Sequence, residues 1–184
     1  FERGVAVHGA GWAFADRPTS LRPPVAAPFV PGTVTEIHPQ AEAWVRSLAE
    51  RLQRGAALLI DYGFPAREYF HAQRAMGTLR CHYRHRAHDD PFFLPGLCDI
   101  TAHVDFSAIA AQGAAAGLHL GGFTTQAHFL INCGITELLL RTAPDDPARY
   151  LPQANAAQRL LSPAEMGELF KVTALTKQLD IPLL

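Results

Sequence analysis

The chain has 184 residues, of which 48% are hydrophobic and 18% are charged, as is typical of a folded globular domain and not of a disordered segment. Its formal net charge of -1 gives no sign of a basic surface for nucleic acid or anionic lipid. The longest apolar runs are far shorter than the ~20 residues of a membrane span. Three separated cysteines without a CxxC pair favour free thiols in a reducing compartment.

The first residues, FERGVAVHGAGWAFA, predict two short strands joined by a glycine turn, because apolar positions alternate on both sides of the turn. They show no signal-peptide layout and no initiator methionine, so we expect the sequence to be part of a longer protein. Five prolines between residues 16 and 32 then predict an extended connection.

The clearest predicted helix begins at Pro39 and ends before Gly55, with one apolar stripe along its length. The run AALLI at 56–60 follows it and predicts a central parallel strand covered by helices on both faces. Asp61 and Tyr62 come next, at the carboxyl end of that strand, where open α/β sheets bind ligands. A turn-capping role for Asp61 is the alternative interpretation.

Residues 65 to 103 have an irregular pattern, with a possible short helix at 66–75, an alternating strand-like run at 78–85 and a loop at 89–97. Connections longer than ~15 residues are usually functional or disordered, and the aromatic and aliphatic content here favours an ordered segment.

From Asp105 onward, helices and strands alternate. Asp105 is placed as the N-cap of a helix that ends at Gly117. The following predicted elements are a strand at 119–126, helices at 126–141, 145–161 and 162–170, and a strand at 171–177. Alternation of this kind predicts the α/β class.

Three histidines at spacing three, His82, His85 and His88, raise the question of a metal site. On a helix the first and third would point ~120° apart and could not converge on one ion. Arg84 and Arg86 lie among them and would repel a cation. We therefore expect no metal ion and interpret these histidines as part of a polar strand and loop.

Four local motifs in this order together resemble the MidA-type methyltransferases, whose mitochondrial member is an arginine methyltransferase that helps to assemble respiratory complex I. The motifs are LLIDYGFPAREYF, GTLRCHYRH, DDPFFLPGLCDITAHVDFSAI and GLHLGGFTTQAHFLINCGI. The resemblance runs from about Trp44 to Ile135 and returns weakly at FKVTALTK.

This resemblance implies a Rossmann-like α/β methyltransferase domain that binds S-adenosylmethionine, with an inserted segment on the substrate side. Residues 1–184 would be the C-terminal part of that single domain, and residues 64–104 would be the insertion over the active site. The glycine-rich cofactor loop of the family does not occur in the chain. The cofactor site would therefore lie mostly upstream, the cofactor-binding residues within this chain are unknown, and the chain alone is expected to be inactive.

Carboxylates suit the binding of a guanidinium group, because they can hold it through two hydrogen bonds, and a histidine can accept the proton that leaves. We expect Asp99 and His103 to be catalytic. The expected substrate-binding residues are Asp61, Tyr62, Arg80, His85 and Gln126.

Each of these residues has a structural alternative. Asp99 could cap a turn, His103 could be a half-buried histidine, and Gln126 could belong to a helix start. Arg80 could form an ion pair with Asp61 or Asp99. Asp105 is expected to be a helix cap rather than a catalyst.

The resulting hypothesis is methyl transfer from S-adenosylmethionine to a protein side chain, with an arginine guanidine nitrogen as the acceptor. The alternatives are a methyltransferase that acts on some other nucleophile, and a non-catalytic assembly or interaction module that keeps the fold. The expected partners are a protein substrate, a respiratory-complex subunit among the candidates, and a second copy of the chain. The resemblance places the protein in the bacterial cytoplasm, or in the mitochondrial matrix if it is eukaryotic.

Overall fold

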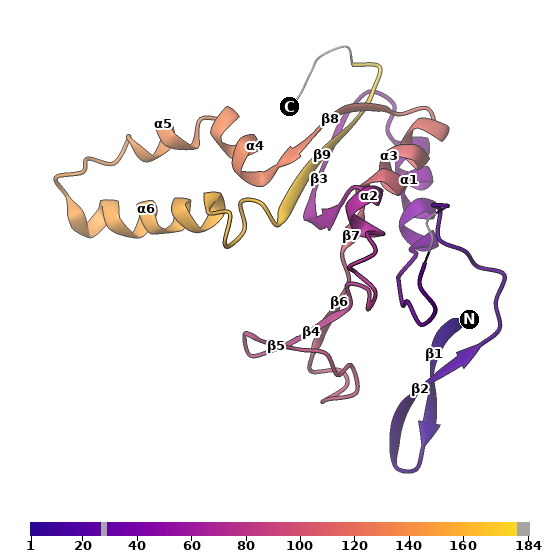
Figure 1. Ribbon diagram of the computed structural model, residues 1–184. Helices are drawn as coiled ribbons and strands as arrows, with labels where there is room; N and C mark the ends of the chain where they lie inside the picture. Colours follow the sequence, from indigo (N-terminus) through magenta and orange to yellow (C-terminus); the bar gives the residue numbers. More distant parts are fainter. Residues whose placement is uncertain (27–28, 180–184) are drawn as a thin grey trace. The chain divides into compact units, whose positions relative to one another are not determined.

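The computed structural model describes residues 1–26 and 29–179 (Figure 1). These residues divide into two compact units. The first unit combines residues 1–38 with residues 67–103, and the second contains the remaining described residues. Strands and helices are mixed along the chain, which confirms the predicted α/β class. Residues 27 and 28 of the predicted extended connection lie outside the described residues.

The N-terminal hairpin of the first unit confirms the prediction from alternating apolar residues. Strand β1 (Glu2–His8) pairs in antiparallel register with β2 (Gly11–Arg17), so that Val5 lies opposite Phe14. Gly9 has φ +60°, a left-handed conformation that glycine adopts without strain at the turn.

The first unit also contains a small three-stranded sheet in the order β5-β4-β6. Its strands are β4 (Arg80–Tyr83), β5 (Arg86–His88) and β6 (Asp99–Thr101). The predicted single strand at 78–85 is wrong in extent, because Arg84 and His85 take left-handed φ values of 48° and 64° and turn the chain back. The predicted helix at 66–75 is only the four-residue α2 (Ala66–Tyr69).

The second unit is built on a four-stranded sheet in the order β7-β3-β9-β8. The strands are β3 (Gly55–Phe64), β7 (Val104–Asp105), β8 (His119–Thr125) and β9 (Phe170–Lys177). Strand β9 runs antiparallel to both of its neighbours, so β3 and β8 point the same way and end at the same edge.

Strand β3 differs from its prediction as a central parallel strand buried on both faces. It pairs antiparallel with β9 from Gly55 to Tyr62, and within the described residues its parallel partner, β7, meets only its last two residues. Leu58 and Ile60 are each 49% exposed, whereas Leu59 packs against the core. An unbroken apolar run reports β-propensity, but it does not report strand direction or how many faces are covered.

Helices α1 (Pro39–Arg51) and α3 (Phe106–Ala115) pack beside each other in the second unit and contribute to its core. The buried cluster consists of Val45, Ala49, Ile109, Leu118 and Leu175. The helix predicted from Pro39 is confirmed, although Trp44, placed on its apolar stripe, is 52% exposed.

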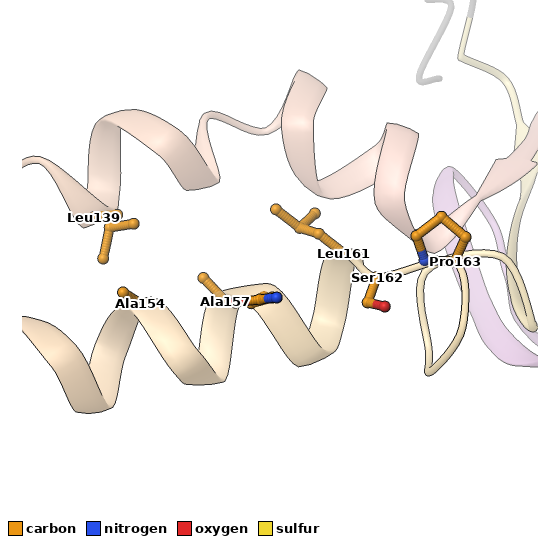
Figure 2. Close-up of a pocket in the computed structure, with 7 residues that line it drawn as sticks. Leu139, Ala154, Ala157, Leu161, Ser162 and Pro163 are labelled. Atoms are coloured by element: carbon orange, nitrogen blue, oxygen red, sulfur yellow. The ribbon is translucent and has the colours of Figure 1, made fainter.

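Three further helices of the second unit lie beyond β8 in the chain: α4 (Gln126–Asn132), α5 (Ile135–Leu139) and α6 (Pro147–Leu161). Gly134, at φ +82°, divides the predicted helix 126–141 into α4 and α5. An open pocket of about 460 Å³ lies where α5 faces α6, and Figure 2 shows Leu139 pointing toward Ala154.

The predicted helix at 162–170 is wrong, because this stretch forms turns before β9 begins. The amide of Gly167 donates to the carbonyl oxygen of Ser162, and a Cβ at Gly167 would collide with the carbonyl oxygen of Leu161. Because Gly167 has no side chain, the backbone can approach this closely and form the turn. Within residues 1–26 and 29–179, no helix is long and apolar enough to cross a membrane.

Candidate functional site

The seven candidate site residues are divided between the two units. Arg80, His85, Asp99 and His103 belong to the first unit, whereas Asp61, Tyr62 and Gln126 belong to the second. Each unit therefore has its own group of candidate residues.

In the second unit, Asp61 lies near the edge of the sheet where β3 and β8 end. Its Oδ1 accepts a hydrogen bond from the Tyr62 amide at 2.8 Å, and its carboxylate stays exposed. Lys171 of β9 is its cross-strand neighbour, and Thr125 of β8 lies opposite Lys171 on the far side. A carboxylate, an ammonium and a hydroxyl group therefore occupy one row across three strands.

Lys171 is oriented by Glu168 within this row. The Lys171 Nζ donates to the Glu168 carbonyl oxygen, and it lies 3.9 Å from a carboxylate oxygen of the same residue. Tyr62 packs edge-on against the Phe170 ring, with ring centroids 5.5 Å apart. Tyr62 and Phe170 are themselves cross-strand neighbours, so this aromatic pair forms the next row of the sheet after Asp61 and Lys171.

The side chain of Gln126 links two helices of the second unit. It is nearly buried, at 6% exposure, and its Nε2 donates to the carbonyl oxygen of Leu160 at 2.9 Å. This bond joins the start of α4 to the last turn of α6. Thr125 caps α4 by accepting from the His128 amide, so the helix-start alternative describes this segment well.

In the first unit, Asp99 is exposed in β6 and lies opposite His82 of β4. Arg80 forms an ion pair with Asp89, which corrects the expected pair with Asp61 or Asp99. His85 occupies the tight turn between β4 and β5 and is exposed.

His103 is held through its backbone. Its amide donates to the Thr78 Oγ1 at 3.0 Å, and Thr78 is 7% exposed. Thr78 in turn donates to the carboxylate of Glu36, which also accepts hydrogen bonds from Tyr69 and from two backbone amides. Sequence reasoning missed Glu36 and Thr78, because their partners are up to 43 positions away and no local motif marks them.

Asp105 is the N-cap of α3, as predicted. Its Oδ1 accepts from the amides of Ser107 at 2.9 Å and Ala108 at 3.2 Å. Burial raises the pKa of the Asp105 carboxyl, and the two amide hydrogen bonds oppose that shift. This geometry is that of a helix cap.

A thiol and imidazole cluster lies on the small sheet of the first unit. Cys81 is fully buried opposite His88, and burial raises the pKa of the Cys81 thiol. The Cys98 Sγ lies 3.6 Å from the His88 Nε2. Among the described residues, no group of three or more His, Cys, Asp or Glu side chains has an arrangement that could hold a metal ion.

Comparison with known families gives one match that covers most of the chain. A family model described as "Putative S-adenosyl-L-methionine-dependent methyltransferase" matches residues 8–124. It confirms the resemblance that the four motifs carry.

Curated mitochondrial proteins are also similar to this chain. The protein arginine methyltransferase NDUFAF7 of Rattus norvegicus is 36% identical over 146 residues, covering 76% of this chain and 31% of that protein. The Homo sapiens protein of the same name is 35% identical over the same coverage. The chain thus spans about a third of the length of these relatives.

Two crystal structures from Burkholderia thailandensis resemble the chain closely. One is a protein bound to S-adenosyl-homocysteine and described as a likely methyl transferase; its TM-score is 0.92 and its identity 54%, over 97% of this chain and 47% of that chain. The other, an uncharacterised protein in its native form, has a TM-score of 0.92 and 52% identity, over 98% of this chain and 50% of that chain.

Proposed function

Because this chain belongs to the family of S-adenosyl-L-methionine-dependent methyltransferases whose model matches residues 8–124, we propose that its protein transfers a methyl group to a protein side chain. The acceptor is an arginine guanidine nitrogen. The observation that carries the proposal is the likeness to the Burkholderia thailandensis protein, which binds S-adenosyl-homocysteine, the product left after methyl transfer.

The arginine acceptor rests on the mitochondrial relatives, which are named as protein arginine methyltransferases. An exposed carboxylate suits such a substrate, because guanidinium is always charged and binds carboxylates through paired hydrogen bonds. Asp99 offers an exposed carboxylate in β6. Its role in this proposal is to hold the guanidinium and orient the attacking nitrogen.

S-adenosylmethionine supplies a methyl group that its sulfonium already activates. The chain's own residues then have two tasks, namely holding the acceptor nitrogen in line and taking up its proton. We assign the second task to His103, whose imidazole is the type of base that operates near neutral pH. Its backbone is fixed by Thr78, which limits where the ring can lie.

The described residues do not by themselves fit the cofactor. Its recognition in Rossmann-like folds uses a glycine-rich turn between a strand and a helix. The Gly121–Gly122 pair instead lies inside β8, where a Cβ at Gly121 would collide with Thr176. We therefore assign the main cofactor contacts to polypeptide outside the described residues and derive no catalytic step through them.

The test uses the complete protein that contains this chain. It would be incubated with S-adenosylmethionine carrying an isotopically labelled methyl group, and with arginine peptides or their lysine-substituted counterparts. Label on the arginine peptides alone is the expected result. Label on lysine or another residue would overturn the arginine assignment. Stable cofactor binding with no transfer to any protein acceptor would favour the non-catalytic assembly module.

A further inference from the structure

The carboxylate of Glu36 is the centre of the most densely bonded polar cluster that the first unit shows. Its Oε1 accepts from the amides of Thr78 at 2.8 Å and Leu79 at 3.0 Å. Its Oε2 accepts from the Thr78 hydroxyl at 3.1 Å and the Tyr69 hydroxyl at 3.3 Å. Hydrogen bonds to an ionised acceptor are roughly twice as strong as neutral ones.

Two of the residues that donate to Glu36 are buried. Tyr69 is 3% exposed and Thr78 is 7% exposed, so donors that lost the carboxylate would have little access to water. Gly77 adopts φ +73°, and a Cβ at this position would collide with the Glu36 carboxylate. The backbone from Gly77 to Leu79 therefore wraps closely around one side chain, which originates about 40 residues earlier in the chain.

The Thr78 hydroxyl connects this cluster to His103. It donates its hydrogen to Glu36, and it accepts a hydrogen bond from the His103 amide at 3.0 Å. A threonine hydroxyl has one hydrogen and two lone pairs, so directing the hydrogen at the carboxylate leaves the lone pairs for His103. Hydrogen bonds in such a chain polarise and strengthen one another.

We propose that Glu36 is a positioning residue, which orients the Thr78 hydroxyl and thereby fixes the backbone of His103. Its importance for catalysis rests on the proposed function, in which His103 takes up the proton. Its mechanical effect, which is to hold the His103 backbone in place through Thr78, does not depend on that function. Sequence distance hides the relationship, since Glu36 and His103 are linked only through Thr78.

The mechanical effect can be measured by residue-resolved amide hydrogen exchange in the complete protein. In Glu36→Gln, the amides of Thr78 and Leu79 should exchange about 10-fold faster or more, and the His103 amide should follow. The matched control is Glu42→Gln, which replaces another half-buried carboxylate whose partner is Gln112. Unchanged exchange at His103 in Glu36→Gln would overturn the proposal and leave Glu36 as a local anchor.

A second pair of variants keeps the test decisive if Glu36→Gln does not fold. Thr78→Val has a similar shape without the hydroxyl, so the His103 amide should exchange faster while the Leu79 amide remains protected by Glu36. Thr78→Ser restores the hydroxyl and should restore His103 protection. Equal exchange at His103 in both variants would contradict the proposal.

Kinetics separate this inference from the proposed function. If the protein methylates arginine, Thr78→Val should lower kcat by about 10-fold with KM for the peptide little changed, and Thr78→Ser should recover most of it. A change in KM alone would mean that Thr78 acts on substrate binding, contrary to the proposal. If the wild-type protein transfers no methyl group, the proposed function fails, while the exchange measurements still decide the role of Glu36.

Discussion

Gln126 donates its side-chain amide to the carbonyl oxygen of Leu160 across 2.9 Å, and so ties the first turn of α4 to the last turn of α6. The amide is nearly buried and bonds to a carbonyl group at a helix end, where backbone oxygens lack intrahelical partners. The contact gives Gln126 a role in stability that is independent of any substrate.

Replacement of Gln126 by Ala should lower the free energy of unfolding by roughly 1 kcal/mol, because the half-buried carbonyl of Leu160 loses its donor. Denaturant unfolding of the complete protein would measure this change. Turnover per folded molecule should stay near that of the wild type. A stable variant with a much larger KM would instead support the substrate-binding role expected from the sequence.

Asp105→Ala should destabilise the protein by about 1 kcal/mol through loss of the α3 cap. Methyl transfer per folded molecule should be close to normal, since both amide partners belong to the helix start. Thermal unfolding and single-turnover rates on the same sample would check both parts. Loss of activity in a fully folded variant would show that Asp105 is a catalytic residue and not only the helix cap.

The raised pKa of Asp105 also predicts a pH dependence of stability. The folded state holds the Asp105 proton to higher pH than the unfolded state does, so its contribution is largest at acidic pH. That contribution should decline as pH rises from about 4 through the raised folded value. The stability advantage of wild type over Asp105→Asn should therefore shrink over this window, and an advantage that grows with pH would contradict the desolvation argument.

Asp99→Asn and His103→Ala should each reduce methyl transfer by about 10-fold or more, equivalent to ~1.4 kcal/mol of barrier. The first removes the charge that we propose orients the guanidinium, and the second removes the proposed proton acceptor. Asp90→Asn is a suitable control, because Asp90 is another exposed carboxylate of the same unit and accepts a hydrogen bond from the Phe92 amide. Normal turnover in both test variants would show that Asp99 and His103 have only a structural role.

Elemental analysis of the purified protein should find well under one equivalent of zinc, iron or manganese. His82 lies in β4, His85 in the turn and His88 in β5, so these three side chains have different settings within one hairpin. A stoichiometric ion that is lost on replacing His82, His85 or His88 would contradict this expectation.

Local pattern in the sequence predicted the elements whose causes are local. Helix α1 follows from the proline at its start and the apolar spacing of its residues, and the cap of α3 follows from Asp105. The N-terminal hairpin follows from alternation around a glycine turn. In each case the residues that decide the structure are close together in the chain, so their spacing carries the information.

Tertiary structure alone decided the direction of β3 and the surroundings of His103. The run AALLI is equally compatible with parallel and antiparallel neighbours, and it lies against β9, more than 100 residues later. Glu36 reaches Thr78 across 42 positions, and Thr78 reaches His103 across 25. Such contacts depend on which distant segments pack together, and the spacing of residues that are near in sequence does not determine this.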